Sequence, residues 1–145
     1  MAYRVICLDS GPNETPTIER SSGATGIIPG MLLKTNSANK FVVHDSAAGA
    51  HESIFALEDL TVGGDIDTAY PSGSVLRAAI VQPGYRVNGL VAAAAAAIVI
   101  GDKLESAGDG TVRKTNADTA IVGFATSAVD NSLGASTARI QFRVA

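Results

Sequence analysis

The chain of 145 residues has the usual size of one domain, and it is long enough to bury a hydrophobic core. Hydrophobic residues make up 46% of it and charged residues only 17%, against about 25% in a typical soluble domain. A surface with so little charge loses little hydration when a partner covers it, so we expect a protein that assembles with other subunits. The net charge of −3 provides no positive field for phosphates, which argues against a nucleic-acid partner.

Two stretches rich in small and turn-forming residues, 10–16 and 21–26, interrupt the first part of the chain. The short strand-like pieces beside them bury little apolar surface of their own. We therefore expect residues 1–25 to form an extended N-terminal arm that a neighbour orders, and residues 26–145 to form a single β-rich domain. The first ten residues lack the charged and apolar regions of a cleaved signal, so synthesis in the cytoplasm is expected.

From Gly26 onward, short apolar and β-branched runs recur between turn-forming residues, which is typical of an all-β sandwich or barrel. These runs are Ile27-Ile28, Met31–Leu33, Phe41–Val43, Ile54–Leu57, Val75–Val81, Ile98–Ile100, Thr111-Val112, Ala120–Phe124 and Ala138–Val144. The last run alternates, which predicts Ile140, Phe142 and Val144 on the buried face. In the segment 103–113, Gly108 and Gly110 supply the positive-φ positions of a tight turn and predict a hairpin.

One helix is expected near residues 89–97, because six alanines, 92–97, follow Asn88-Gly-Leu-Val. Alanine has the highest helix propensity, and the Asn88 side chain could cap the first turn. The alternative is a strand of small residues packed close to another backbone, since the run continues as Ile98-Val-Ile. At about eleven residues, the apolar run 90–100 is too short to span a bilayer, so no membrane partner is expected.

A weak internal repeat relates the two halves of the chain. Ile28-Pro-Gly-Met-Leu-Leu-Lys resembles Ile100-Gly-Asp-Lys-Leu-Glu, and each is followed by a polar hairpin tip. The later strand starts that correspond are Ile54 with Ile121, and Val75 with Ala138. Two related β-layers would account for this pattern. The spacing differs between the halves, so chance similarity among glycine-bounded strands is the alternative.

We find no catalytic, cofactor-binding or metal-binding pattern, and we predict neither an enzyme nor a cofactor. His44, Asp45 and Ser46 are sequence neighbours, and with His51 they are interpreted as a solvated loop, because a hydrolase triad needs groups that a rigid scaffold brings together. Cys7 lies between apolar residues, which favours a small buried hydrophobe over a reactive thiol.

Carboxylates cluster at 63–67 and at 101–109, but neither cluster has the alternating ligands of a calcium loop. We interpret them as turn and surface residues, with Asp102 and Glu105 available to face a basic partner surface. The basic residues are spread over strand-like segments, which indicates solvated faces and ion pairs. They are Arg77, Arg86, Arg113, Lys114, Arg139 and Arg143.

The second half of the chain resembles the head decoration, or capsid cement, proteins of tailed bacteriophages. The resemblance covers about residues 70–145 and is carried by Val87–Val112, by Ala120-Ile-Val-Gly-Phe-Ala, and by the alternating C-terminal strand. Gly26-Ile-Ile-Pro-Gly-Met-Leu-Leu is a weaker match before it.

This resemblance implies a β-rich protein on the exterior of the virion, commonly a homotrimer, that binds the major capsid protein and clamps neighbouring subunits after shell expansion. Within this family a sandwich, a barrel and a β-tulip are all compatible architectures. The alternative function is a fibre or a carbohydrate- or receptor-binding β-module, for which Tyr70 and Tyr85 are the candidate aromatic platform. A third possibility is a small hydrolase that uses the scattered acids.

Overall fold

The computed structural model describes residues 5–9, 15–59 and 65–145, and this part of the chain contains ten strands and no helix. The strands are β1 Thr17–Ser21, β2 Leu32–Thr35, β3 Phe41–Val43, β4 Ile54–Ala56, β5 Val75–Ile80, β6 Arg86–Val91, β7 Lys103–Ser106, β8 Val112–Thr115, β9 Ile121–Ala125 and β10 Ala138–Val144. The all-β prediction is confirmed. No helix that could cross a membrane occurs in the described ranges.

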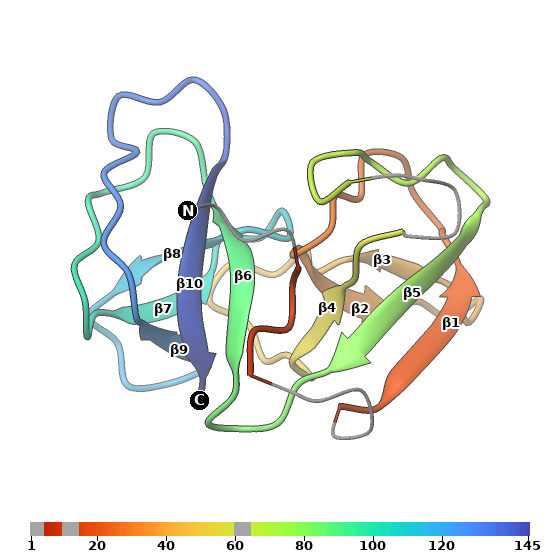
Figure 1. Ribbon diagram of the computed structural model, residues 1–145, viewed down its shortest axis with the longest axis horizontal. Coiled ribbons are helices and arrows are strands. Elements are labelled where there is room, and N and C mark those ends of the chain that lie inside the picture. The colour runs from red at the N-terminus through yellow and green to blue at the C-terminus, as the bar shows by residue number, and fades with distance from the viewer. Residues whose placement is uncertain (1–4, 10–14, 60–64) are drawn as a thin grey trace.

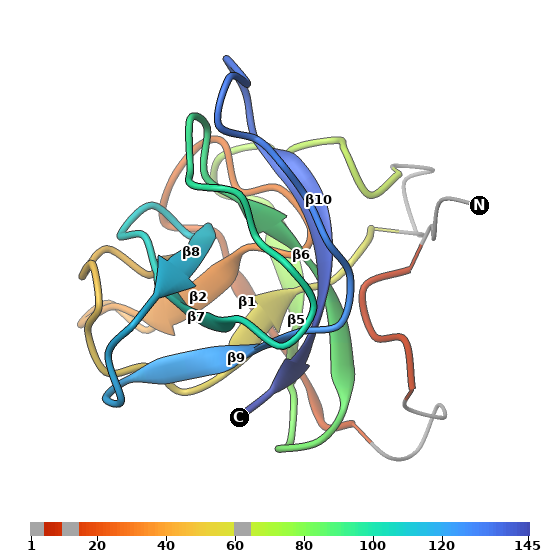
Figure 2. The ribbon, with the colours of Figure 1, turned by 90° about the vertical axis from the view of Figure 1, so that its left-hand side faces the viewer.

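The strands form two units that lie side by side along the long axis of the molecule (Figure 1). The N-terminal unit comprises β1–β5, which form one sheet in the order β1-β5-β4-β2-β3. The C-terminal unit comprises β6–β10, which close into a small barrel in the order β10-β6-β8-β7-β9 (Figure 2). The chain is therefore divided close to its middle, between β5 and β6.

The two units have the same strand connectivity. Read around the barrel from β6, the order is β6-β10-β9-β7-β8, which is the order of the N-terminal sheet with five added to each number. The barrel closes where Val91 pairs in parallel with Val112. In the N-terminal unit, a single parallel bridge between Ser22 and Phe41 joins the corresponding strands. The internal repeat expected from the sequence is thus confirmed as a repeated five-stranded unit.

The hydrogen bonds at the start of β2 and β7 repeat as well. The Gly30 N–H donates to the Ala56 carbonyl at 2.7 Å, and the Gly101 N–H donates to the Ala125 carbonyl at 2.8 Å. Both glycines have positive φ, 92° and 93°, which explains why the turn before each strand carries glycine in both halves. By this match, Gly30 of the N-terminal unit corresponds to Gly101 of the C-terminal unit.

Two further sequence predictions are confirmed in the C-terminal unit. Ile140, Phe142 and Val144 are buried on one face of β10, as the alternation indicated. β7 and β8 form the expected antiparallel hairpin, with positive φ at Gly108 and Gly110.

The helix predicted near residues 89–97 is wrong. Asn88 does not cap a helix: it lies inside β6, and its backbone N–H donates to the Ile6 carbonyl at 2.8 Å. The alanines after β6 form a loop, because the Ala92 N–H pairs with the Val112 carbonyl and Ala94 has a φ of 54°. A helix this short is marginal on its own propensity, so these tertiary hydrogen bonds decide the conformation.

The hydrophobic core joins the two units. One buried cluster fills the C-terminal unit and also includes residues of the outer face of the N-terminal sheet, such as Leu32 and Phe55. The Phe55 and Phe142 rings pack across the boundary with their centroids 5.7 Å apart. A second cluster fills the N-terminal unit and includes Leu90 from β6. Each unit therefore contributes side chains to the core of the other.

The described part of the expected N-terminal arm lies against the domain. β1 pairs with β5 along its whole length. Residues 5–9 run beside β6, where Cys7 bridges Val87 and the Ile6 side chain is fully buried. A separate arm that ends at residue 25 stays a prediction, since its other residues lie outside the described part of the chain.

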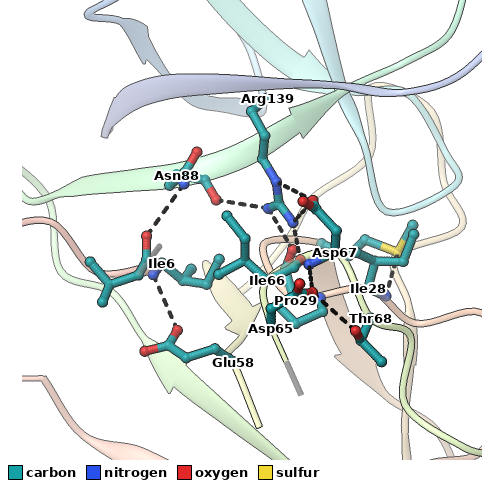
Figure 3. A network of polar contacts seen from close by, with 12 residues as sticks. Ile6, Ile28, Pro29, Glu58, Asp65, Ile66, Asp67, Thr68, Asn88 and Arg139 are labelled. Atoms are coloured by element: carbon teal, nitrogen blue, oxygen red, sulfur yellow. Dashed lines mark hydrogen bonds and ion pairs between the residues drawn. The ribbon is translucent and has the colours of Figure 1, made fainter. Parts of the chain in front are cut away.

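Arg139 of β10 holds the polar side of the boundary between the units (Figure 3). Its guanidinium donates to the Pro29 carbonyl at 2.7 Å, to the Asn88 carbonyl at 3.4 Å and to the Ile66 carbonyl, and it pairs with the Asp67 carboxylate at 3.0 Å. The planar guanidinium suits this role because its donors point in fixed, divergent directions. One side chain thus ties the turn before β2 and the loop before β5 to the C-terminal unit.

Removal of the Phe55 ring tests the shared core. We expect Phe55→Ala to lower the free energy of unfolding by about 3–5 kcal/mol, because it leaves a cavity at the boundary between the units. Phe124→Ala, on the partly exposed outer face of β9, is the matched control and should cost less than about 1 kcal/mol. Urea denaturation measures both. Equal losses for the two variants would contradict the shared core.

Replacement of Arg139 tests the polar contact. Arg139→Met keeps much of the side-chain volume but leaves three carbonyls without this donor, so we expect a loss of about 3 kcal/mol in the free energy of unfolding. Arg143→Met is the matched control on the exposed face of the same strand, and its expected effect is within about 0.5 kcal/mol. A stable Arg139→Met protein would show that the units do not need this contact.

Candidate interaction surface

His44 is buried, with only 3% of its surface exposed, so the interpretation of this residue as part of a solvated loop is wrong. Its Nδ1 lies 2.7 Å from the Ser106 Oγ of β7, and its Nε2 lies 2.7 Å from the Ala50 carbonyl. Because the Ala50 carbonyl can only accept, Nε2 is the donor in that contact. Asp45 pairs instead with Lys34 at 2.6 Å, so His44, Asp45 and Ser46 do not assemble into a triad.

His51 is half-buried near the same boundary. Its Nε2 donates to the Ile121 carbonyl of β9 at 3.2 Å, and its Nδ1 accepts the Ser53 N–H at 3.3 Å. The two imidazole rings pack edge to face, with centroids 6.3 Å apart. Burial lowers the pKa of His51 below its ordinary value of 6.5. Both histidines therefore attach the loop between β3 and β4 to the C-terminal unit.

The carboxylates singled out in the sequence belong to turns and ion pairs. The Asp65 carboxylate accepts from the Asp67 N–H and from the Thr68 hydroxyl, which stabilises the loop before β5 (Figure 3). The Val99 N–H and the Lys114 ammonium hold the pKa of Asp102 below its usual range. Within residues 5–9, 15–59 and 65–145, no three histidine, cysteine or acidic side chains gather into a metal site.

Most of the basic residues named in the sequence pair with acids on neighbouring strands or loops. The ion pairs are Arg77–Glu19, Arg86–Asp9, Arg113–Glu105, Lys114–Asp102 and Arg139–Asp67. This distribution agrees with the prediction of ion pairs on strand faces. Each pair compensates a positive charge locally, and most of them are partly solvated, so they add little to stability.

The two tyrosines do not form an exposed aromatic platform. Tyr70 is buried, its hydroxyl donates to the Leu57 carbonyl at 2.7 Å, and burial raises its pKa to about 12. Tyr85 is partly buried and packs against the core that both units share. A sugar ring could not stack on Tyr70 without unfolding of the loop around it.

Large apolar side chains are exposed at both ends of the molecule. In the turn before β7, Val99 and Ile100 are 57% and 71% exposed. Leu133, in the loop before β10, is almost fully exposed, and Val75 at the start of β5 is 60% exposed. Exposed apolar groups of this size mark interaction sites when they gather on one surface. The turn before β7, with two consecutive apolar side chains, is therefore the candidate interaction surface.

A shallow hollow of about 330 Å³ lies against the alanine loop that follows β6. It is lined by residues 92–96, Ala107, Asp109, Arg113 and Lys114. The methyl groups offer van der Waals contact, and both basic side chains are already paired with acids. The hollow is thus suited to contact with a protein surface more than to tight binding of a small charged ligand.

Sequence reasoning interpreted residues 98–100 as another strand and so missed their exposure. In the structure only Ile98 pairs, through a bridge to Val129, and its side chain is buried. The internal repeat signalled that this segment is not a strand, because residues 27–29 correspond to residues 98–100 and include Pro29, which cannot donate to a ladder. It gave no signal of the exposure, because Pro29 is buried.

The shifted pKa of His51 predicts a pH dependence of stability. The unfolded chain takes up a proton on this histidine at a higher pH than the folded chain, so the free energy of unfolding falls as the pH falls from about 7.5 to about 5.5. His51→Gln is expected to flatten this decrease. The exposed neighbour Glu52→Gln is the matched control, and urea denaturation at both pH values provides the measurement. The same slope in wild type and His51→Gln would contradict the assignment.

Comparison with known proteins identifies a similar fold. No protein-family model matches the sequence, and no curated protein is significantly similar to it. Among solved structures, the chain is similar to the head fiber gp8.5 N base in bacteriophage phi29, with a TM-score of 0.58 and 11% identity. The match covers 90% of this chain and 94% of the other. The two chains therefore share their fold over almost their whole length.

Proposed function

We propose that this protein is a structural component of a bacteriophage virion that binds the outer surface of the head. The observation that carries the proposal is the fold shared with the base of a head fibre over 90% of the chain. The resemblance of residues 70–145 to head decoration proteins supports the same class of function on separate grounds. At 11% identity the shared fold alone does not imply a shared partner, so the two observations are needed together.

In this proposal the partner is the major capsid protein, and the role is to clamp neighbouring capsid subunits and so stabilise the expanded head. The low charge and the exposed apolar side chains suit a surface that a larger assembly covers. Many weak contacts repeated over a symmetric shell give strong attachment through avidity. The protein itself is a homo-oligomer, with a trimer favoured, and it has no enzymatic, nucleic-acid or membrane role.

A second candidate is the attachment base of a fibre, with receptor or carbohydrate binding as the associated role. The description of the similar structure as a head fibre base favours the attachment part of this candidate. The burial of Tyr70 removes half of the aromatic platform on which the carbohydrate part depended.

Binding to phage heads tests the proposal. We expect the purified protein to co-sediment with expanded empty heads of its phage that lack it, to saturate at a fixed number of copies, and to raise their melting temperature. Unexpanded heads are the control. They should bind less protein, because the binding positions between capsid subunits change when the shell expands.

Absence of binding to expanded heads would refute the decoration role. A glycan array on the same preparation distinguishes the second candidate: a signal that Tyr85→Ala abolishes would support carbohydrate binding. A glycan array without signal, together with saturable binding to heads, supports the structural role.

A further inference from the structure

The repeated units allow each surface of one to be compared with its equivalent in the other. Pro29 and Gly30, in the turn before β2, are both buried. A Cβ atom on Gly30 would lie 2.6 Å from the Asn88 carbonyl oxygen and 2.6 Å from the Arg139 Nη1. Leu90 from the same strand as Asn88 packs into the core of the N-terminal unit. The outer face of β6 and β10 therefore covers this turn within the chain.

The equivalent turn of the C-terminal unit, residues 99–101, has no such cover. Ile100 and Gly101 occupy the places of Pro29 and Gly30, and both are exposed. A Cβ atom on Gly101 would meet nothing within 4 Å. The same backbone turn, with matching hydrogen bonds, is thus buried in one unit and open in the other.

Other uncovered positions of the C-terminal unit have become polar. Met31 and Val43 of the N-terminal unit pack against the hairpin tip at Gly110, where a Cβ atom would lie 3.2 Å from each of them. Their equivalents, Asp102 and Lys114, form an ion pair at 2.9 Å. Against this trend, Val99 and Ile100 are large, apolar and exposed, as residues at interaction sites are.

The covering face has its own equivalent in the N-terminal unit. Arg139 pairs with Leu90 across β10 and β6, and Val75 pairs with Ser21 across β5 and β1 in the same position. Val75 therefore takes the place of Arg139, and it is exposed. The start of β5 and the segment that leads into β7 lie at opposite ends of the molecule, so they cannot meet within one chain (Figure 1).

We propose that copies of this protein associate head to tail, with the 99–101 turn of one copy against the Val75 face of the next. The contact repeats between chains the packing that joins the units within a chain, and an apolar pair replaces the polar contact of Arg139 with Pro29. Because the two patches differ, the contact is heterologous, and it closes into a ring or continues as a chain. This surface concerns contacts between copies and does not depend on capsid binding.

Two aspartate substitutions test the arrangement by complementation. Ile100→Asp places a charge on the 99–101 patch and leaves the Val75 face intact, whereas Val75→Asp places a charge on the Val75 face and leaves the 99–101 patch intact. Both sites are exposed, so both variants are expected to fold as the wild type does. Each variant alone should weaken self-association at least about tenfold, because a charge would be buried without a partner. An equimolar mixture should form a dimer and stop there, since only one intact contact remains.

Sedimentation velocity and light scattering over a range of concentrations measure these masses. Leu133→Asp is the control, because Leu133 is exposed but belongs to neither patch, and it should associate as the wild type does. A wild type that stays monomeric at the highest attainable concentration would overturn the proposal, as would either variant with wild-type association. A mixture without dimers would exclude the head-to-tail geometry. Head binding is measured separately: a monomeric wild type would refute the head-to-tail contact and the homo-oligomer of the proposed function, but would leave the attachment to heads standing.

Discussion

The structure depends on the packing of two similar β-units against each other. Each unit supplies side chains to the core of its neighbour, so each hydrophobic cluster contains residues of both units. Phe55 and Phe142 join the units through their rings, and Arg139 joins them through backbone carbonyls. The loops that carry His44, His51, Pro29 and Ile66 are held at this boundary by hydrogen bonds to the C-terminal unit.

The sequence predicts the elements that local chemistry determines. The alternation of β10, the glycine turns of the β7–β8 hairpin and the repeat of the β2 and β7 starts all involve residues close in the chain. Features set by distant residues were not predictable. The alanines after β6 form a loop because Ala92 donates to the Val112 carbonyl and accepts from the Asn131 side chain. The ring of His44 hydrogen-bonds to Ser106, which lies 62 positions away in the sequence.

The repeat also explains why chemically different residues occupy equivalent places. Where the neighbouring unit covers a position, the residue is apolar, as at Met31; where solvent covers it, the residue is charged, as at Asp102. A surface that is exposed but apolar does not follow this pattern and is a candidate contact with a partner. Neither composition nor periodicity could reveal such a surface, because it appears only when the two halves are compared in three dimensions.

The position of residues 5–9 has a consequence for the order of folding. The strands of the N-terminal unit are contiguous in the chain, so that unit can assemble while later residues are still being synthesised. Ile6, in contrast, pairs with Asn88 across more than half the length of the protein. Residues 5–9 therefore cannot dock in this position before β6 has been synthesised.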